Sequence, residues 1–72
     1  MFITLTELLY TREQKAPQEL QLRINAQYLI FYLATGRDTR VELSTSTIRV
    51  KETPEQIDKL LGTLPPYKFP KQ

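Results

Sequence analysis

The chain contains no cysteine, no histidine and no tryptophan, and only two of its 72 residues are glycine. Without cysteine there is no disulfide framework and no thiolate ligand for a structural zinc ion. Without histidine the usual imidazole ligand and the usual general base are both missing. The eight acidic residues are scattered rather than clustered as a calcium or magnesium site requires. We therefore expect no metal, no cofactor and no catalytic site.

The chain also lacks a strong charge of either sign. Ten Lys and Arg against eight Asp and Glu leave a formal net charge of +2. The signs alternate, as in Arg12-Glu13 and Lys51-Glu52, which is typical of an ordinary solvated surface. No apolar run approaches the roughly 20 residues of a membrane span, and the N-terminus has no secretory signal. These absences predict a cytoplasmic protein without a membrane span.

A length of 72 residues lies near the lower limit for one hydrophobic core, so a second domain is excluded. We expect a single small domain over residues 1–63. Residues 64–72 include Pro65, Pro66 and Pro70, which oppose regular hydrogen-bonded structure. This segment is predicted to be an extended, disordered tail.

Alternation of apolar and polar residues marks most of the predicted strands. It is clearest over residues 20–25, where Leu20, Leu22 and Ile24 share one face. Similar patterns predict strands over residues 2–9, 39–43 and 47–51, and a long polar loop over residues 10–19. The strands at 39–43 and 47–51 flank a polar turn and are expected to pair as an antiparallel hairpin.

Residues 27–34 form a run that is apolar on both faces. A helix of about two turns is one interpretation. A strand is favoured, because the run is short, rich in aromatic and branched residues, and followed by Gly36 at a turn.

The strongest local signature predicts a helix after Thr53. Thr53 offers an N-cap hydroxyl, Pro54 suits the first helical position, and Gln56 completes a capping box. Ile57, Leu60 and Leu61 form one apolar stripe expected to face the sheet, and Gly62 is placed to end the helix.

These elements predict an α+β fold: a small, bent antiparallel sheet or open barrel of four to five strands with one C-terminal helix. The inward-facing apolar positions form the predicted core: Ile3, Leu5, Leu20, Leu22, Ile24, Ile30, Val41, Leu43, Ile48, Val50, Ile57, Leu60 and Leu61.

Four segments carry a family resemblance: residues 3–6, 24–26, 38–43 and 48–53, the last leading into the helix. Their order and spacing resemble the small FlbD and SwrD type flagellar and swarming proteins, and similar short proteins of phages. The resemblance covers residues 3–61. It implies a non-catalytic protein near the flagellar motor or its assembly, with no active-site residues to carry over.

Tyr28, Phe31 and Tyr32 are the main candidates for protein contact. On a strand, Tyr28 and Tyr32 would share one face and Phe31 would occupy the other. A face left uncovered would form an apolar patch of the kind that binds a partner or a second copy. The competing interpretation is that sheet, helix or barrel curvature buries both faces.

Arg23, Arg40 and Arg49 lie opposite the predicted buried positions and are candidates for a basic face. With tyrosines nearby, such a stripe suits weak nucleic-acid binding. Glu42 is predicted to lie on the same face, so an ordinary charged outer surface is favoured.

Two further motifs have simple structural explanations. Tyr67 and Phe69 in the proline-rich tail are candidates for a short linear contact motif, against the alternative of a frayed terminus. Glu42 and Glu52 resemble an acid/base pair only in residue type, because each has a basic neighbour on a predicted outer face.

The sequence thus predicts a non-enzymatic protein-binding or assembly module, with a protein partner or self-association and no small-molecule substrate. The family resemblance implies that it is flagellum-related. Two alternatives stay open: a small phage regulator docking on a host enzyme such as RNA polymerase, and a weak nucleic-acid-binding domain.

Overall fold

A computed structural model describes residues 1–62 and contains five strands, a short 3-10 turn and one α-helix. In chain order these elements are β1 (Phe2–Leu9), β2 (Gln18–Asn25), η1 (Ala26–Tyr28), β3 (Leu29–Ala34), β4 (Thr39–Leu43), β5 (Thr47–Val50) and α1 (Pro54–Leu61). The predicted α+β fold is confirmed, with a five-stranded open antiparallel sheet and one C-terminal helix. The predicted tail lies outside the described residues.

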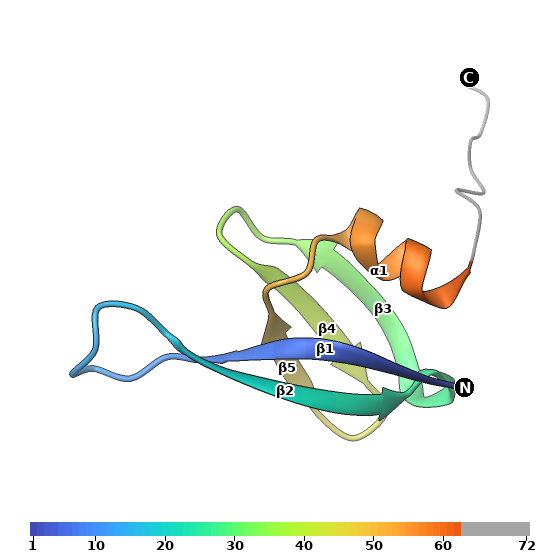
Figure 1. The fold of residues 1–72 in the computed structure, drawn as a ribbon, viewed down its shortest axis with the longest axis horizontal. Coiled ribbons are helices and arrows are strands. Elements are labelled where there is room, and N and C mark those ends of the chain that lie inside the picture. Colours follow the sequence, from blue (N-terminus) through green and yellow to red (C-terminus); the bar gives the residue numbers. More distant parts are fainter. Residues whose placement is uncertain (63–72) are drawn as a thin grey trace.

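The strands follow the order β2-β1-β5-β4-β3, and every pair is antiparallel. The predicted hairpin of β4 and β5 is confirmed. β1 pairs with β2 over its whole length, and Glu7 of β1 meets Val50 of β5. Figure 1 shows the β1–β2 hairpin crossing over the β3–β4–β5 meander. β2 and β3 are the two edge strands of the sheet.

The helix α1 has the termini that the sequence predicts. The Thr53 hydroxyl accepts a hydrogen bond from the Gln56 N–H at 3.2 Å, and the Gln56 side-chain oxygen accepts one from the Thr53 N–H at 2.9 Å. Gly62 ends the helix with a φ of 77°, a left-handed conformation that favours glycine. Both ends of α1 are therefore stabilised locally.

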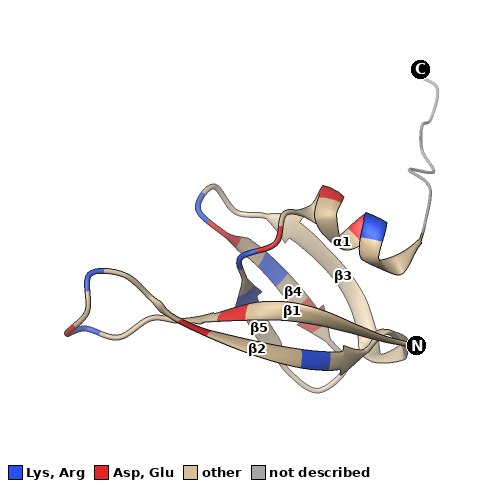
Figure 2. Cartoon of the chain, in the orientation of Figure 1, with Lys and Arg blue, Asp and Glu red and all other residues tan. Residues whose placement is uncertain are grey.

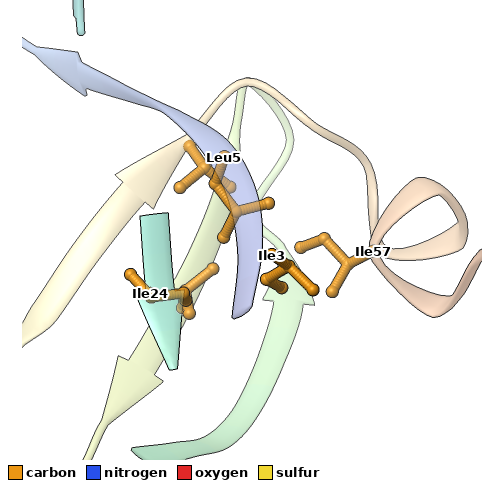
Figure 3. Close-up of a cluster of buried hydrophobic side chains, with 6 residues drawn as sticks. Ile3, Leu5, Ile24 and Ile57 are labelled. Carbon is orange, nitrogen blue, oxygen red and sulfur yellow. The ribbon is translucent and has the colours of Figure 1, made fainter. Parts of the chain in front are cut away.

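The core gathers side chains from four strands and the helix. Its buried members are Ile3, Leu5, Ile24, Val41, Val50 and Ile57, and Figure 3 shows Ile57 of α1 next to Ile3. Four further predicted core residues are partly buried against this cluster: Leu22, Leu43, Ile48 and Leu61. Ten of the thirteen predicted core residues thus lie in or against the core.

Three predicted core residues are exposed instead. Leu20 pairs with Glu7, where the β1–β2 hairpin begins to extend beyond the Glu7–Val50 contact with β5. Ile30 lies at an irregularity of the β3–β4 pairing, between Leu29 and Phe31, which breaks the alternation of faces. Leu60 lies on the open side of α1, because Ile57 and Leu61 make the contact with the core.

Among the described residues, one buried apolar side chain was missed by the sequence pattern. Leu8 is buried but lies outside the main cluster. Its position along β1 differs in parity from those of Ile3 and Leu5, so alternation assigns it to the other face.

The apolar run at 27–34 is not one strand. Asn25 Oδ1 accepts a hydrogen bond from the Gln27 N–H at 3.0 Å, and the Met1 carbonyl accepts one from the Ala26 N–H at 2.8 Å. These bonds stabilise η1, which contains Tyr28, and β3 starts only at Leu29. The prediction that Tyr28 and Tyr32 share one face of a strand is therefore wrong.

Candidate functional site

The edge strand β3 and the preceding turn η1 carry a group of exposed apolar side chains. Tyr28 is 58% exposed, Ile30 63%, Phe31 45% and Leu33 40%. We call these four residues the β3 surface. No charged residue occurs in η1 or β3, and Figure 2 shows β3 without acidic or basic colour along its length. The surface is thus apolar and uncharged.

Pairing with β4 determines which residues lie beside the apolar side chains of β3. Phe31 lies opposite Glu42, and Leu33 lies opposite Arg40. Directly opposed residues of an antiparallel pair share a face, so Phe31 and Leu33 lie on the same face as these charged residues. The Arg40 guanidinium is 5.8 Å from the centre of the Phe31 ring. The apolar residues of β3 are therefore bordered by charge on β4.

Tyr32 has a different environment from the rest of the aromatic run. Its side chain is half-buried against the core, and its hydroxyl donates a hydrogen bond to Asp58 Oδ1 on α1. Of the three aromatic candidates, Tyr28 and Phe31 are exposed whereas Tyr32 connects β3 to the helix. Ile30 and Leu33 join the surface, although the sequence pattern placed Ile30 in the core and did not single out Leu33.

The three candidate basic residues are only partly brought together. Arg40 and Arg49 are directly opposed on β4 and β5. Arg23 pairs with Thr4, three residues along β1 from the Glu7–Val50 contact, a separation of about 10 Å along the strand. Arg23 is therefore set apart from the other two.

Acidic groups compensate the two adjacent arginines. Arg49 Nη1 lies 3.0 Å from Asp38 Oδ1 in a hydrogen-bonded ion pair. Arg40 Nε lies 3.2 Å from Glu42 Oε2, a charge contact without hydrogen-bond geometry. This pairing reduces the positive potential available to a phosphate backbone.

Asp38 is the centre of a polar cluster that the sequence pattern did not identify. Its side chain has no solvent exposure. Asp38 Oδ2 accepts a hydrogen bond from the Tyr10 hydroxyl at 2.7 Å, and Oδ1 accepts from Thr35 Oγ1 at 2.7 Å and from Arg49 Nη1 at 3.0 Å. The cluster joins the end of β1, the β3–β4 turn and β5, so we assign it a structural role.

The ionisation of this cluster follows from its contacts. Burial acts to raise the pKa of Asp38, but the hydrogen bonds from Tyr10, Thr35 and Arg49 and the charge of Arg49 outweigh it, so its pKa lies below the usual value. The hydrogen bond to Asp38 is the largest cause of a raised pKa at Tyr10. The Arg37 guanidinium lies 4.4 Å from the centre of the Tyr10 ring.

Glu42 and Glu52 bind separate partners. Glu52 was expected to be solvated, but it accepts hydrogen bonds from the Thr6 N–H at 2.8 Å and the Thr6 hydroxyl at 2.9 Å. Glu42 contacts Arg40 and accepts a hydrogen bond from the Thr47 hydroxyl at 2.9 Å. Glu52 therefore connects the segment before α1 to β1.

Within residues 1–62, no group of three or more acidic side chains is arranged to hold a metal ion. No helix in the same part of the chain is long and apolar enough to cross a membrane. The tail candidates Tyr67 and Phe69 lie outside the described residues.

Comparison with known proteins gives no match, since no family model, no curated protein and no solved structure is significantly similar to this chain.

Proposed function

We propose that this chain is a non-enzymatic protein-binding or assembly module and that the β3 surface is its contact site. One observation carries the proposal: an edge strand without any charge presents apolar side chains to solvent. An edge strand offers backbone donors and acceptors to another chain, and exposed apolar side chains add area to the contact. Such a surface suits strand addition by a protein partner.

The other edge strand provides an internal comparison. β2 carries Glu19 and Arg23, and Lys51 Nζ lies 3.3 Å from Glu19 Oε2. Charged side chains on an edge strand discourage pairing with other chains. β3 has no such protection, so it is the edge suited to a partner.

The proposal is tested by placing a charge on β3. Ile30→Glu should abolish both self-association and capture of partner proteins, because the charge would be buried without a counter-ion in the contact. Sedimentation of the purified protein and capture from a cell lysate measure the two forms of binding. The fold should persist in circular dichroism, since Ile30 is among the most exposed apolar residues of the described chain.

Gln21→Glu is the matched control, because it adds the same charge to an exposed position of the other edge strand. It should leave both forms of binding intact. Equal binding by the Ile30→Glu protein and the wild type would refute the β3 surface as the contact site. The flagellar or swarming context and the docking of a phage regulator on a host enzyme such as RNA polymerase stay predictions about the type of partner.

A further inference from the structure

We propose that the partner of β3 is the β3 strand of a second copy of this chain, paired antiparallel about a two-fold axis beside Tyr32. This inference rests on the proposed function and names the occupant of its contact site. The pairing would join two five-stranded sheets into one continuous sheet. The hydrogen bonds that β3 makes with β4 limit the registers that this pairing can take, and the proposed register places the exposed residues Phe31 and Leu33 opposite each other.

The hydrogen-bonding pattern determines which residues of β3 direct their backbone toward the edge. The Thr35 N–H donates to the Asp38 carbonyl at 2.9 Å, and the Ser44 N–H donates to the Tyr28 carbonyl at 2.8 Å. Bonded residues alternate along an antiparallel strand, so Phe31 and Leu33 bond toward β4. Ala34 therefore points its backbone groups toward the open edge, whereas Ile30 lies at the irregularity, where this alternation is interrupted.

A two-fold axis beside Tyr32 fixes which residues of the two copies lie opposite each other. Ile30 of each copy then lies opposite Ala34 of the second copy, and the backbone groups of Ala34 face the contact. Phe31 of each copy lies opposite Leu33 of the second copy, and the two side chains share a face. No charged residue of β3 meets another across the axis, because β3 contains none.

The area of the surface fits a reversible dimer. A large side chain offers about 200 Å² of surface, so the four residues of the β3 surface, 40–63% exposed, supply roughly 400 Å² per copy. Two copies would bury at most roughly 800 Å² from these side chains, which belongs with transient rather than permanent interfaces. Symmetric pairing of β3 also closes on itself, whereas pairing of β3 with the charged β2 edge would generate an open polymer.

Cysteine cross-linking tests this register, because the chain has no cysteine of its own. Phe31→Cys and Leu33→Cys proteins are prepared separately, mixed and oxidised. Opposed positions have Cα atoms about 4.5 Å apart, within disulfide reach, whereas Phe31 lies about 8 Å from its own symmetry mate. The mixed disulfide should exceed each homodimer by about tenfold. As a control, Leu33→Cys is mixed with Thr45→Cys, whose cysteine lies in the exposed β4–β5 turn and not opposite Leu33. This mixture should not form the mixed disulfide preferentially.

The outcomes separate the inference from the proposed function. Preferential formation of the mixed disulfide, with dimers of the wild type in sedimentation, supports the two-fold pairing. Dimers without that preference overturn it, and so does a wild-type protein that stays monomeric. If a monomeric wild type still captures another protein and Ile30→Glu abolishes this capture, the partner is not a second copy of this chain. The proposed function then stands.

Discussion

At the scale of single residues, Asp38 is the one charged residue that is buried in the described part of the chain. Its carboxylate is fully enclosed and accepts hydrogen bonds from three side chains. Asp38→Asn keeps the shape but removes the charge that faces Arg49 and turns one oxygen into a donor. We expect a loss of about 1 to 3 kcal/mol in the free energy of unfolding, measured by urea denaturation at neutral pH. Unchanged stability would contradict the structural role of Asp38.

The same carboxylate predicts a pH dependence. The folded pKa of Asp38 lies below its usual value of 3.8, so the folded state binds this proton less readily than the unfolded state. The stabilisation is complete above the unfolded pKa and is lost as the pH falls through the lower folded pKa. Wild type should therefore lose more stability than Asp38→Asn between about pH 5 and pH 2. Parallel stability curves for the two proteins would count against this assignment.

The sequence pattern did not single out Asp38, which lies two residues after the predicted turn at Gly36. Arg37 and Asp38 are adjacent opposite charges after Gly36, a pattern that normally indicates solvent. Burial of Asp38 depends on Tyr10 and Arg49, which come from segments distant in sequence. Glu52 was misjudged for the same reason, since its partner Thr6 lies 46 residues away.

At the scale of elements, α1 was the most predictable part of the fold because its signals are local. Thr53, Pro54, Gln56 and Gly62 each act within one turn of the helix. The run at 27–34 was less predictable, because η1 depends on the Met1 carbonyl and the irregularity of β3 depends on its pairing with β4. Neither the Met1 contact nor the irregular pairing can be predicted from residue types alone.

The packing of α1 gives a paired prediction. Ile57 is fully buried in the core, whereas Leu60, four-tenths exposed, lies outside the core cluster. Ile57→Ala should cost about 2 to 5 kcal/mol of unfolding free energy, since it leaves a cavity that a short helix cannot fill. Leu60→Ala should cost clearly less than Ile57→Ala, because four-tenths of the Leu60 surface is already exposed and the residue lies outside the core cluster.

Thermal melting of both variants at equal concentration measures the difference. The wild type and a surface substitution such as Gln21→Ala serve as references. A greater loss for Leu60→Ala than for Ile57→Ala would mean that α1 packs through its other side.

At the scale of the whole molecule, strand order was the feature that sequence did not reveal. The strands themselves follow from alternation, but the position of β1 between β2 and β5 arises from contacts between opposite ends of the chain. That order makes β3 an edge strand, and the edge position makes Phe31 and Leu33 available for the proposed contact. The aromatic candidates were therefore found by composition, while their availability required the fold.

Self-association through β3 predicts that stability depends on concentration. Binding to the folded state stabilises it by mass action, so the melting temperature of the wild type should rise with protein concentration. The Ile30→Glu protein should melt at one temperature throughout the same series. Differential scanning calorimetry over a range of about two decades in protein concentration compares the melting temperatures of the two proteins. A wild-type melting temperature that does not change would contradict the dimer.

The contact between β1 and β5 has a further consequence for how the chain folds. The Thr6 carbonyl accepts a hydrogen bond from the Lys51 N–H at 2.9 Å, and Thr6 also donates to Glu52. The chain between Thr6 and Lys51 must close into a loop before β1 can pair with β5 and complete the sheet. Closing a long loop costs entropy, so folding is slower than in a chain of local contacts. During synthesis the β1–β2 hairpin leaves the ribosome before β5 and Glu52, so it cannot complete the sheet until they have followed. The pairing of β1 with β5 is therefore a late step of folding, and the β1–β2 hairpin must wait for it with one side of β1 unpaired.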